Sequence, residues 1–307
     1  MMAYLPEGFL INTTENRKNI DSFENFSKAY REGVPIEARV SFCDCSHNLH
    51  IDFGFIEGII PREECAIGIA DGSTKDIAII SRVNKPVKFI IEKIEEQDDK
   101  KVAILSRRKI QEQFTNNYLS QLCPGDVIDA KITHLEAFGA FCDIGCGVTA
   151  LLPIDNISVS RIPHPNVRFS VGDVIKVIIK SFDELGRVTL THKELLGTWE
   201  ENAKLFKVGE TVSGIVRSIE SYGIFVELTP NLSGLAEYTN DVCEGDCASI
   251  YIKSIIPDKM KFKLIIVDSF EAEHIKKKPR YFTTQKHIDH FRYSPENSTK
   301  IIETTFE

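Results

Sequence analysis

Hydrophobic and polar residues alternate along two stretches in the middle of the chain. Over residues 127–133, and again over 174–180, every second residue is apolar. The apolar positions are Ile128, Ala130 and Ile132 in the first stretch and Ile175, Val177 and Ile179 in the second. A period of two is typical of a strand with one buried face. Residues 187–191 predict a further short strand, since they are rich in β-branched side chains.

Glycines separate these strands and mark the turns between them. They stand at positions 139, 145, 147, 172 and 186. Several short antiparallel strands between residues 121 and 196 predict a small closed barrel of five strands, such as an OB-fold. The more polar stretches at 107–121 and 193–206 predict short helices or linkers between such barrels.

The same pattern occurs a second time, 84 residues further along the chain. Gly125–Ile132 matches Gly209–Val216, and the motif Phe138-Gly139-Ala140-Phe141 matches Tyr222-Gly223-Ile224-Phe225 at the same offset (209 − 125 and 222 − 138). Two separate motifs in one register indicate two copies of one structural unit.

A more divergent copy lies upstream at an offset of 92 residues. Gly33–Val40 resembles Gly125–Ile132, and Gly58–Pro61 resembles the run that ends at Pro153. The sequence therefore predicts an all-β protein with three tandem OB-fold barrels joined by short helical linkers. The expected boundaries are an N-terminal extension at 1–30, repeats at 31–110, 121–196 and 207–269, and a basic C-terminal tail at 270–307.

Charge and composition limit the class of function. The formal net charge is −8 and the pI about 5.6, which argues against a simple polycation that coats nucleic acid. The chain has no apolar stretch of the roughly 20 residues that span a bilayer, and residues 1–17 lack the features of a secretory signal. We therefore expect a cytoplasmic protein. The C-terminal tail nevertheless carries a cluster of basic residues: Lys276, Lys277, Lys278, Arg280, Lys286 and Arg292.

Neither a catalytic motif nor a metal motif stands out. The chain has no P-loop, HExxH, GxSxG or GxGxxG sequence, so we expect no enzyme activity and no cofactor. The closely spaced cysteine pairs, such as Cys43 with Cys45, lack the two-residue gap of zinc knuckles. His287 and His290 are three residues apart, but the sequence shows no partners for a metal site. We expect none.

The repeated aromatic pairs are the strongest functional candidates. In each pair the two aromatic residues are three positions apart, with a glycine directly after the first: Phe138 and Phe141 in one repeat, Tyr222 and Phe225 in the next. This spacing could present their rings as flat faces side by side. RNA bases stack on such faces for about 1–3 kcal/mol each. The alternative is that these rings fill the barrel cores. The basic residues expected on nearby polar faces are Lys131, Lys176, Arg187, Arg217 and Lys261.

The second repeat resembles the ribosomal protein S1 RNA-binding domain. The resemblance lies in Phe138–Ile144, in Gly147–Pro153 and in the stretch from Ser170 to Leu190. The third repeat is similar through Tyr222–Leu228 and Ser233–Leu235. A tandem array without a catalytic body resembles the bacterial small-subunit ribosomal protein S1 family, whose members recruit messenger RNA during translation.

This resemblance implies roles for individual residues. The base-stacking rings would be Phe138, Phe141, Tyr222 and Phe225. Asp183 and Arg187 would form a polar pair beside the rings, and Asp258 and Lys261 stand in roughly the same places in the third repeat. A histidine that is common in the family is replaced here by Pro153 and Glu237. In the first repeat, His47 and His50 occupy the ring positions, so that repeat is expected to dock on the ribosome.

The leading hypothesis is thus a non-enzymatic protein that binds single-stranded RNA and associates with the small ribosomal subunit. An alternative is a protein-interaction scaffold that docks on the ribosome or on an RNA-processing enzyme, with little RNA affinity of its own. The acidic net charge and the first repeat favour that alternative. A regulatory subunit of a nuclease is a third, weaker possibility.

Overall fold

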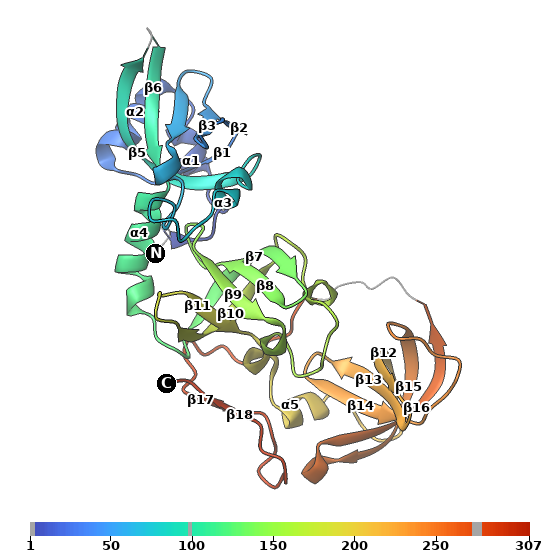
Figure 1. Ribbon diagram of the computed structural model, residues 1–307. Helices are drawn as coiled ribbons and strands as arrows, with labels where there is room; N and C mark the ends of the chain where they lie inside the picture. Colours follow the sequence, from blue (N-terminus) through green and yellow to red (C-terminus); the bar gives the residue numbers. More distant parts are fainter. Residues whose placement is uncertain (1–3, 98–99, 272–277) are drawn as a thin grey trace. The chain divides into compact units, whose positions relative to one another are not determined.

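The computed structural model describes residues 4–97, 100–271 and 278–307. It divides into two compact units (Figure 1). The first comprises Met1–Leu122 with Asp143–Thr149, and the second comprises Cys123–Cys142 with Ala150–Glu307. Among the described residues, no helix is both long and apolar enough to cross a membrane.

The first unit is one curled sheet with short helices around it. Its helices are α1 (Thr14–Asn19), α2 (Phe23–Glu32), α3 (Ile77–Ile80) and α4 (Arg108–Asn117). Its strands are β1 (Ile36–Arg39), β2 (Phe42–Cys43), β3 (Leu49–Asp52), β4 (Glu57–Ile60), β5 (Pro86–Gln97) and β6 (Lys100–Ser106).

The order of strands in this sheet is β1-β5-β6-β4-β3-β2. The two edge strands, β1 and β2, are consecutive in the chain and separated only by Val40 and Ser41. The sheet therefore curls until its two edges meet, with the first strand of a barrel broken into two pieces. Val40 donates its N–H to Lys85 on one side of the break, and Ser41 donates to His50 on the other.

The second unit holds two closed five-stranded barrels. The first is built from β7 (Val127–Glu136), β8 (Gly139–Asp143), β9 (Thr149–Pro153), β10 (Val174–Phe182) and β11 (Val188–Thr191). The second is built from β12 (Thr211–Glu220), β13 (Gly223–Thr229), β14 (Leu232–Ala236), β15 (Cys247–Ile256) and β16 (Lys261–Phe270). Helix α5 (Trp199–Ala203) precedes the second barrel, and β17 (His290–Arg292) pairs with β18 (Glu303–Thr305) near the C-terminus.

All three repeats share one strand register. When β1 and β2 are counted as one broken strand, the third and fifth strands of each repeat are parallel. The paired residues are Ile59 with Ile104, Leu151 with Thr189, and Leu235 with Lys263. The positions 59, 151 and 235 differ by 92 and 84 residues, the offsets found in the sequence. The three tandem OB-folds are therefore confirmed, with Ile128, Ala130 and Ile132 buried in the first closed barrel.

The N-terminal residues are part of the first unit and not a separate extension. Helix α2 begins after Ser22, whose side chain accepts the N–H of Asn25, and it ends at Gly33, which has a φ of 63°. Phe26 and Ala29 of this helix are buried in the same core cluster as the strands of the sheet.

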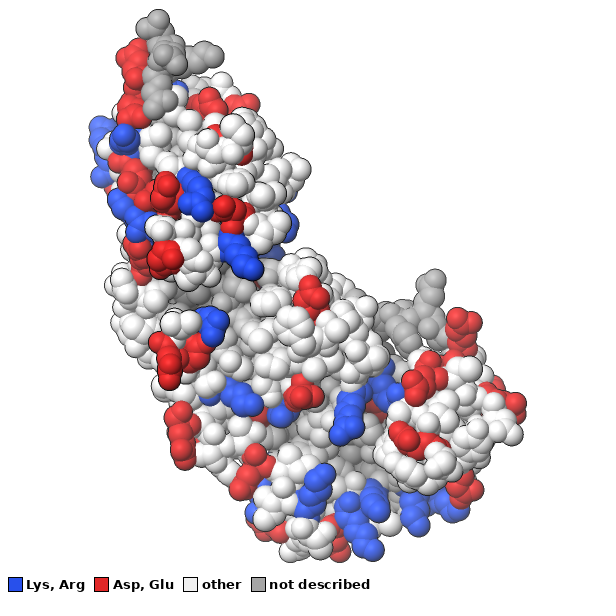
Figure 2. All heavy atoms as spheres, in the orientation of Figure 1, with Lys and Arg blue, Asp and Glu red and all other residues white. Residues whose placement is uncertain are grey.

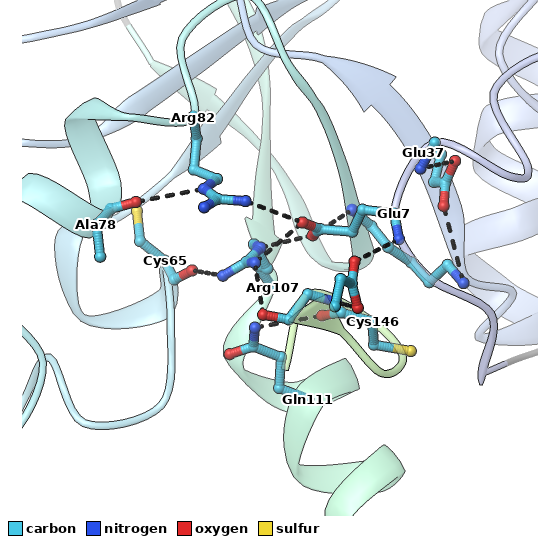
Figure 3. A network of polar contacts seen from close by, with 12 residues as sticks. Glu7, Glu37, Cys65, Ala78, Arg82, Arg107, Gln111 and Cys146 are labelled. Atoms are coloured by element: carbon cyan, nitrogen blue, oxygen red, sulfur yellow. Dashed lines mark hydrogen bonds and ion pairs between the residues drawn. The ribbon is translucent and has the colours of Figure 1, made fainter. Parts of the chain in front are cut away.

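A buried polar network joins the N-terminal segment to the rest of the first unit (Figure 3). Arg107 donates from Nε and Nη2 to the two carboxylate oxygens of Glu7 at 2.6 and 3.0 Å. Burial would raise the pKa of Glu7, but the charge and hydrogen bonds of Arg107 outweigh that effect and lower it. Asp143 accepts the backbone N–H of Glu7 at 2.7 Å. Burial, followed by the charge of Glu7, raises the pKa of Asp143 to about 6.

The described part of the C-terminal tail belongs to the second unit and packs against its first closed barrel. Phe282 donates its N–H to the carbonyl of Leu195 at 3.0 Å. Ile288 and Phe306 form a buried cluster with Ile178 and Leu195, which explains why Ile178 is buried although it lies on the polar face of its strand. The described part of the predicted basic tail is thus docked on the protein. Of its basic cluster, Lys276 and Lys277 lie outside the described residues.

Candidate nucleic-acid interface

The two predicted ring pairs have the same geometry in both closed barrels. The ring centroids of Phe138 and Phe141 are 5.9 Å apart with an interplanar angle of 88°. Those of Tyr222 and Phe225 are 6.2 Å apart, also at 88°. The rings therefore meet edge to face and do not lie side by side as flat faces, because the edge of one ring is attracted to the face of another.

These rings are not part of the barrel cores. Phe138 is 56% exposed and Tyr222 is 67% exposed, while Phe141 and Phe225 are half-buried. Each pair thus consists of a supported ring and an outer ring that offers its face to solvent. This arrangement argues against the alternative that the rings fill the core.

The glycine between the two rings is required by a close approach of strands. A Cβ on Gly139 would lie 2.5 Å from the carbonyl oxygen of Leu152. Gly223, with a φ of 147°, stands in the same position, and its Cβ would lie 2.5 Å from the carbonyl oxygen of Ala236. Any side chain here would push the second strand of the barrel away from the third and shift the aromatic residues on it.

In the second barrel, the rings open onto a groove of about 560 Å³. Lys253, Lys261 and Lys263 line this groove together with Tyr222 and Phe225. Lys253 also forms an exposed ion pair with Glu237 at 3.3 Å. Among the described residues, no ion pair is formed by Lys261 or Lys263. Positive charge and aromatic faces therefore share one hollow.

The positive charge of this barrel is visible on its surface. In Figure 2, Lys and Arg side chains gather along the lower edge of the view, where Figure 1 draws the hairpin of β15 and β16. In the part of Figure 2 that belongs to the first unit, acidic and basic side chains alternate instead. The net negative charge of the chain is thus unevenly distributed.

In the first closed barrel, the aromatic surface includes a third ring. His134 lies 6.3 Å from Phe141 with an interplanar angle of 25°, and its Nε2 is 2.7 Å from Glu136. Lys131 is half-buried on β7, opposite Val174 of β10. Lys176, on β10, forms an exposed ion pair with Asp129. The sequence pattern did not identify His134 as a member of this surface.

Asp183 and Arg187 form an exposed pair at the turn between β10 and β11. The Arg187 Nε is 2.6 Å from the carboxylate, and Asp183 also accepts the backbone N–H groups of Leu185 and Arg187. The hydrogen bonds from Arg187 lower the pKa of Asp183. Asp183 therefore orders the turn, and the guanidinium is held at its tip.

The strand register places Arg187 and Lys261 at equivalent positions. Each lies two residues before the residue that pairs with the third strand, Thr189 in one barrel and Lys263 in the other. Lys261 lines the groove of the second closed barrel, so Arg187 lies on the corresponding face of the first closed barrel.

Arg217 is the one predicted contact residue that lies away from the exposed surface. Its side chain is only 8% exposed, and its Nε is 2.7 Å from Glu227. Arg168, in the loop between β9 and β10, donates to both oxygens of the same carboxylate at 2.7 and 2.6 Å. Arg217 therefore belongs to a buried charge cluster that joins the two barrels, and its guanidinium does not lie on the exposed surface with the ring pairs.

The corresponding face of the first unit has a different chemistry. Phe42 is half exposed and stacks on His50, with centroids 4.3 Å apart and an interplanar angle of 7°. The two nitrogens of His50 lie 2.8 Å from Glu57 and 3.2 Å from Asp44. Burial would raise the pKa of Asp44, but hydrogen bonds from Asn48 and His50 lower it to about 2. This face is aromatic but acidic.

Comparison with known families gives one match to a domain. Residues 122–193 match the S1 RNA binding domain. This segment contains the first closed barrel and the ring pair Phe138 and Phe141.

Curated relatives are similar over a larger part of the chain. The small ribosomal subunit protein bS1 of Staphylococcus epidermidis is 32% identical over 201 residues, which cover 60% of this chain and 51% of the relative. The protein of the same name from Leuconostoc lactis is 30% identical over 229 residues, covering 72% and 51%. The chain thus spans about half the length of these relatives.

Two solved structures show weaker likeness. GSP13 from Bacillus subtilis is 29% identical, with a TM-score of 0.22, over 23% of this chain and 55% of its own. A multidomain protein with nucleic acid binding domains from Streptococcus pneumoniae is 13% identical, with a TM-score of 0.25, over 78% of this chain and 75% of its own.

Proposed function

We propose that this chain, which belongs to the S1 RNA-binding domain family through residues 122–193, holds single-stranded RNA on the two closed barrels of its second unit. The observation that carries the proposal is the groove in which Tyr222 and Phe225 lie beside Lys253, Lys261 and Lys263. No catalytic step is needed for this function.

Each barrel supplies both interactions that a flexible strand requires. The exposed rings of Phe138 and Tyr222 stack bases, and every base has an aromatic face, so sequence preference is modest. Lysines in the groove and Arg187 at the equivalent turn attract phosphates. A paired RNA helix hides its bases, so the single strand is preferred.

Two barrels on one chain bind better than either barrel alone. When one barrel has bound a strand, the other meets the next nucleotides at a high effective concentration. The buried cluster of Arg168, Glu227 and Arg217 holds the two barrels together. Less conformational entropy is therefore lost when RNA binds across both barrels.

The test is fluorescence anisotropy with a labelled single-stranded RNA. The variant Tyr222→Ala/Phe225→Ala should lose about 2–6 kcal/mol of binding free energy, twice the contribution of one stacked base. The matched control is Phe42→Ala, which removes an exposed ring from the first unit and should leave affinity unchanged. Unlabelled duplex RNA should compete poorly with the single strand.

Two results would contradict the proposal. One is the absence of binding by the wild-type protein at low salt, where electrostatic attraction is strongest. The other is equal affinity of the wild type and the Tyr222→Ala/Phe225→Ala variant. In either case the barrels would act through protein partners.

For the first unit, we propose docking on the small ribosomal subunit, in the cytoplasm. Two observations support this: the relatives are named as proteins of that subunit, and the face of Phe42 and His50 carries acidic groups that repel RNA. Co-sedimentation with purified small subunits tests it. Phe42→Ala should weaken co-sedimentation while RNA affinity is retained, and unchanged co-sedimentation would argue against docking through this face.

A further inference from the structure

The C-terminal segment crosses the start of the first closed barrel at the turn formed by residues 123–126. The N–H of Val127 donates to the carbonyl of Lys286, and the N–H of Ile288 donates to the carbonyl of Gly125. A Cβ on Gly125 would lie 2.4 Å from the carbonyl oxygen of Ile288. Glycine at this position therefore allows the segment to approach the turn closely.

This contact brings together three different metal-binding groups that are far apart in the sequence. The Nδ1 of His287 is 2.7 Å from Oδ1 of Asp126 and 4.0 Å from Sγ of Cys123. The same sulfur is 3.5 Å from Oδ2 of Asp126. Among the described residues, this is the one group of three or more His, Cys, Asp or Glu side chains whose donor atoms lie so close together.

The distances suit a tetrahedral ion. With Zn–S near 2.3 Å and Zn–N or Zn–O near 2.0–2.1 Å, ligand atoms in a tetrahedral site lie roughly 3.4–3.6 Å apart. The three separations observed here range from 2.7 to 4.0 Å. Rotations of the exposed Cys123 side chain and the half-exposed His287 side chain would bring these separations closer to that range.

A second carboxylate lies where an outer ligand is found in many metal sites. Oδ1 of Asp289 is 3.1 Å from Nε2 of His287, on the far side of the ring from Asp126. A carboxylate there orients the imidazole and leaves Nδ1 directed at the metal. The two carboxylates also make the surroundings of the ring electronegative, which favours a cation.

A second turn in the same chain provides an internal comparison. Cys243 and Asp246 form a similar turn before β15, a different strand of the last barrel, and Cys243 donates its N–H to Asp246 at 2.8 Å, as Cys123 does to Asp126. No histidine among the described residues is grouped with that pair. The cysteine and aspartate alone are thus explained by turn formation, and His287 is what makes the first turn different.

We propose that Cys123, Asp126 and His287 bind a zinc ion, with water as the fourth ligand. The cysteine thiol loses its proton to solvent when the sulfur binds. Zinc is a borderline-soft metal that is bound by cysteine sulfur, histidine nitrogen and carboxylate oxygen, and this group of side chains supplies one of each. The bound ion would hold the C-terminal segment to the barrel, over the buried cluster of Ile178, Leu195, Ile288 and Phe306.

The test is titration of the reduced full-length protein with Co²⁺, which substitutes for zinc and reports a bound thiolate by a near-ultraviolet charge-transfer band. The band should appear at one equivalent and be displaced by Zn²⁺. It should be lost in Cys123→Ser and in His287→Ala. Asp289→Asn should weaken the affinity for Co²⁺ by roughly 10–100-fold.

Cys243→Ser is the matched control and should keep the band unchanged. Zinc should also slow hydrogen exchange of the Val127 and Ile288 amides in the wild type and in Cys243→Ser, but not in Cys123→Ser. The proposal is overturned if no thiolate band forms, or if the band persists in Cys123→Ser, since the metal would then be bound by other cysteines or by surface carboxylates.

Discussion

The face of the first unit and the groove of the last barrel occupy the same side of the same fold but have opposite chemistry. In both, an exposed aromatic residue is supported by a second ring, Phe42 by His50 and Tyr222 by Phe225. Around the first ring pair lie Asp44 and Glu57. Around the second lie three lysines.

The comparison separates what sets the fold from what sets the function. Identical strand order and register follow from alternating apolar residues and from turns, which all three repeats retain. In the proposed function, affinity for RNA depends on a few surface positions that the core does not constrain. A repeat can therefore lose one function and gain another without a change of topology.

The largest expected effect is a loss of stability in the first unit while the second unit stays folded. Arg107→Ala leaves the carboxylate of Glu7 buried without its main partner, and breaking a buried pair costs about 3–5 kcal/mol. Urea unfolding followed by circular dichroism should show an early loss of the first unit. The fluorescence of Trp199, the one tryptophan of the chain, should be unaffected because it lies in the core of the last barrel.

The control for this prediction is an ion pair on the surface. Arg187→Ala removes an exposed partner of Asp183 and should change the free energy of unfolding by at most about 1 kcal/mol. A comparable loss of stability in both variants would mean that the buried network does not hold the first unit together.

The second prediction is that the two units respond to acid in opposite directions. Burial lowers the pKa of His192, in the second unit, to about 4, so the unfolded chain takes up a proton first and stability is lost as the pH falls below 6.5. By linkage the loss is about 2 kcal/mol at pH 5. Asp143 is the last residue of β8 but is grouped with the first unit, where it accepts the N–H of Glu7, and its pKa is raised to about 6. Its protonation therefore stabilises the folded first unit as the pH falls through 6.

Unit-specific hydrogen exchange at pH 7.5 and pH 5 measures this difference. Buried amides of the second unit should exchange more readily at pH 5, after correction for intrinsic rates, and those of the first unit less readily. His192→Gln and Asp143→Asn should each flatten the response of one unit. A common direction in both units would refute the assignment of these two groups.

The smallest effect concerns the salt dependence of RNA binding. Lys261→Ala/Lys263→Ala removes two charges from the groove. Each phosphate contact contributes about 0.7 to the slope of log K against log salt for single strands, so the slope should fall by about 1.4. Lys28→Ala, on helix α2 of the first unit, should leave the slope unchanged.

Most of the fold could be predicted from the sequence, because alternating apolar residues in strands and glycines in turns are local signals. It also located both ring pairs, since Phe138 and Tyr222 stand in one repeated motif. Contacts between distant segments were beyond its reach. The burial of Arg217 depends on Arg168 and Glu227, and the grouping of His287 with Cys123 depends on a backbone contact between residues more than 150 positions apart.

Two further errors have the same physical origin. Residues 1–30 were expected to form a separate extension, because the many polar residues around Phe26 give no local sign that its side chain belongs to the core of the sheet. Lys253 and Lys263 were not selected, because the pairing of β16 with β14 and with β15 is what places them in the groove beside Tyr222.

The central claim is that RNA lies on the barrels of the second unit and not on the first. Ultraviolet cross-linking of a bound single-stranded RNA, followed by mass spectrometry of the cross-linked peptides, locates the RNA directly. We predict cross-links at Phe138, Phe141, Tyr222 and Phe225, and none at Phe42 or His50. Cross-links concentrated on Phe42 and His50, with none on the barrels, would contradict the account.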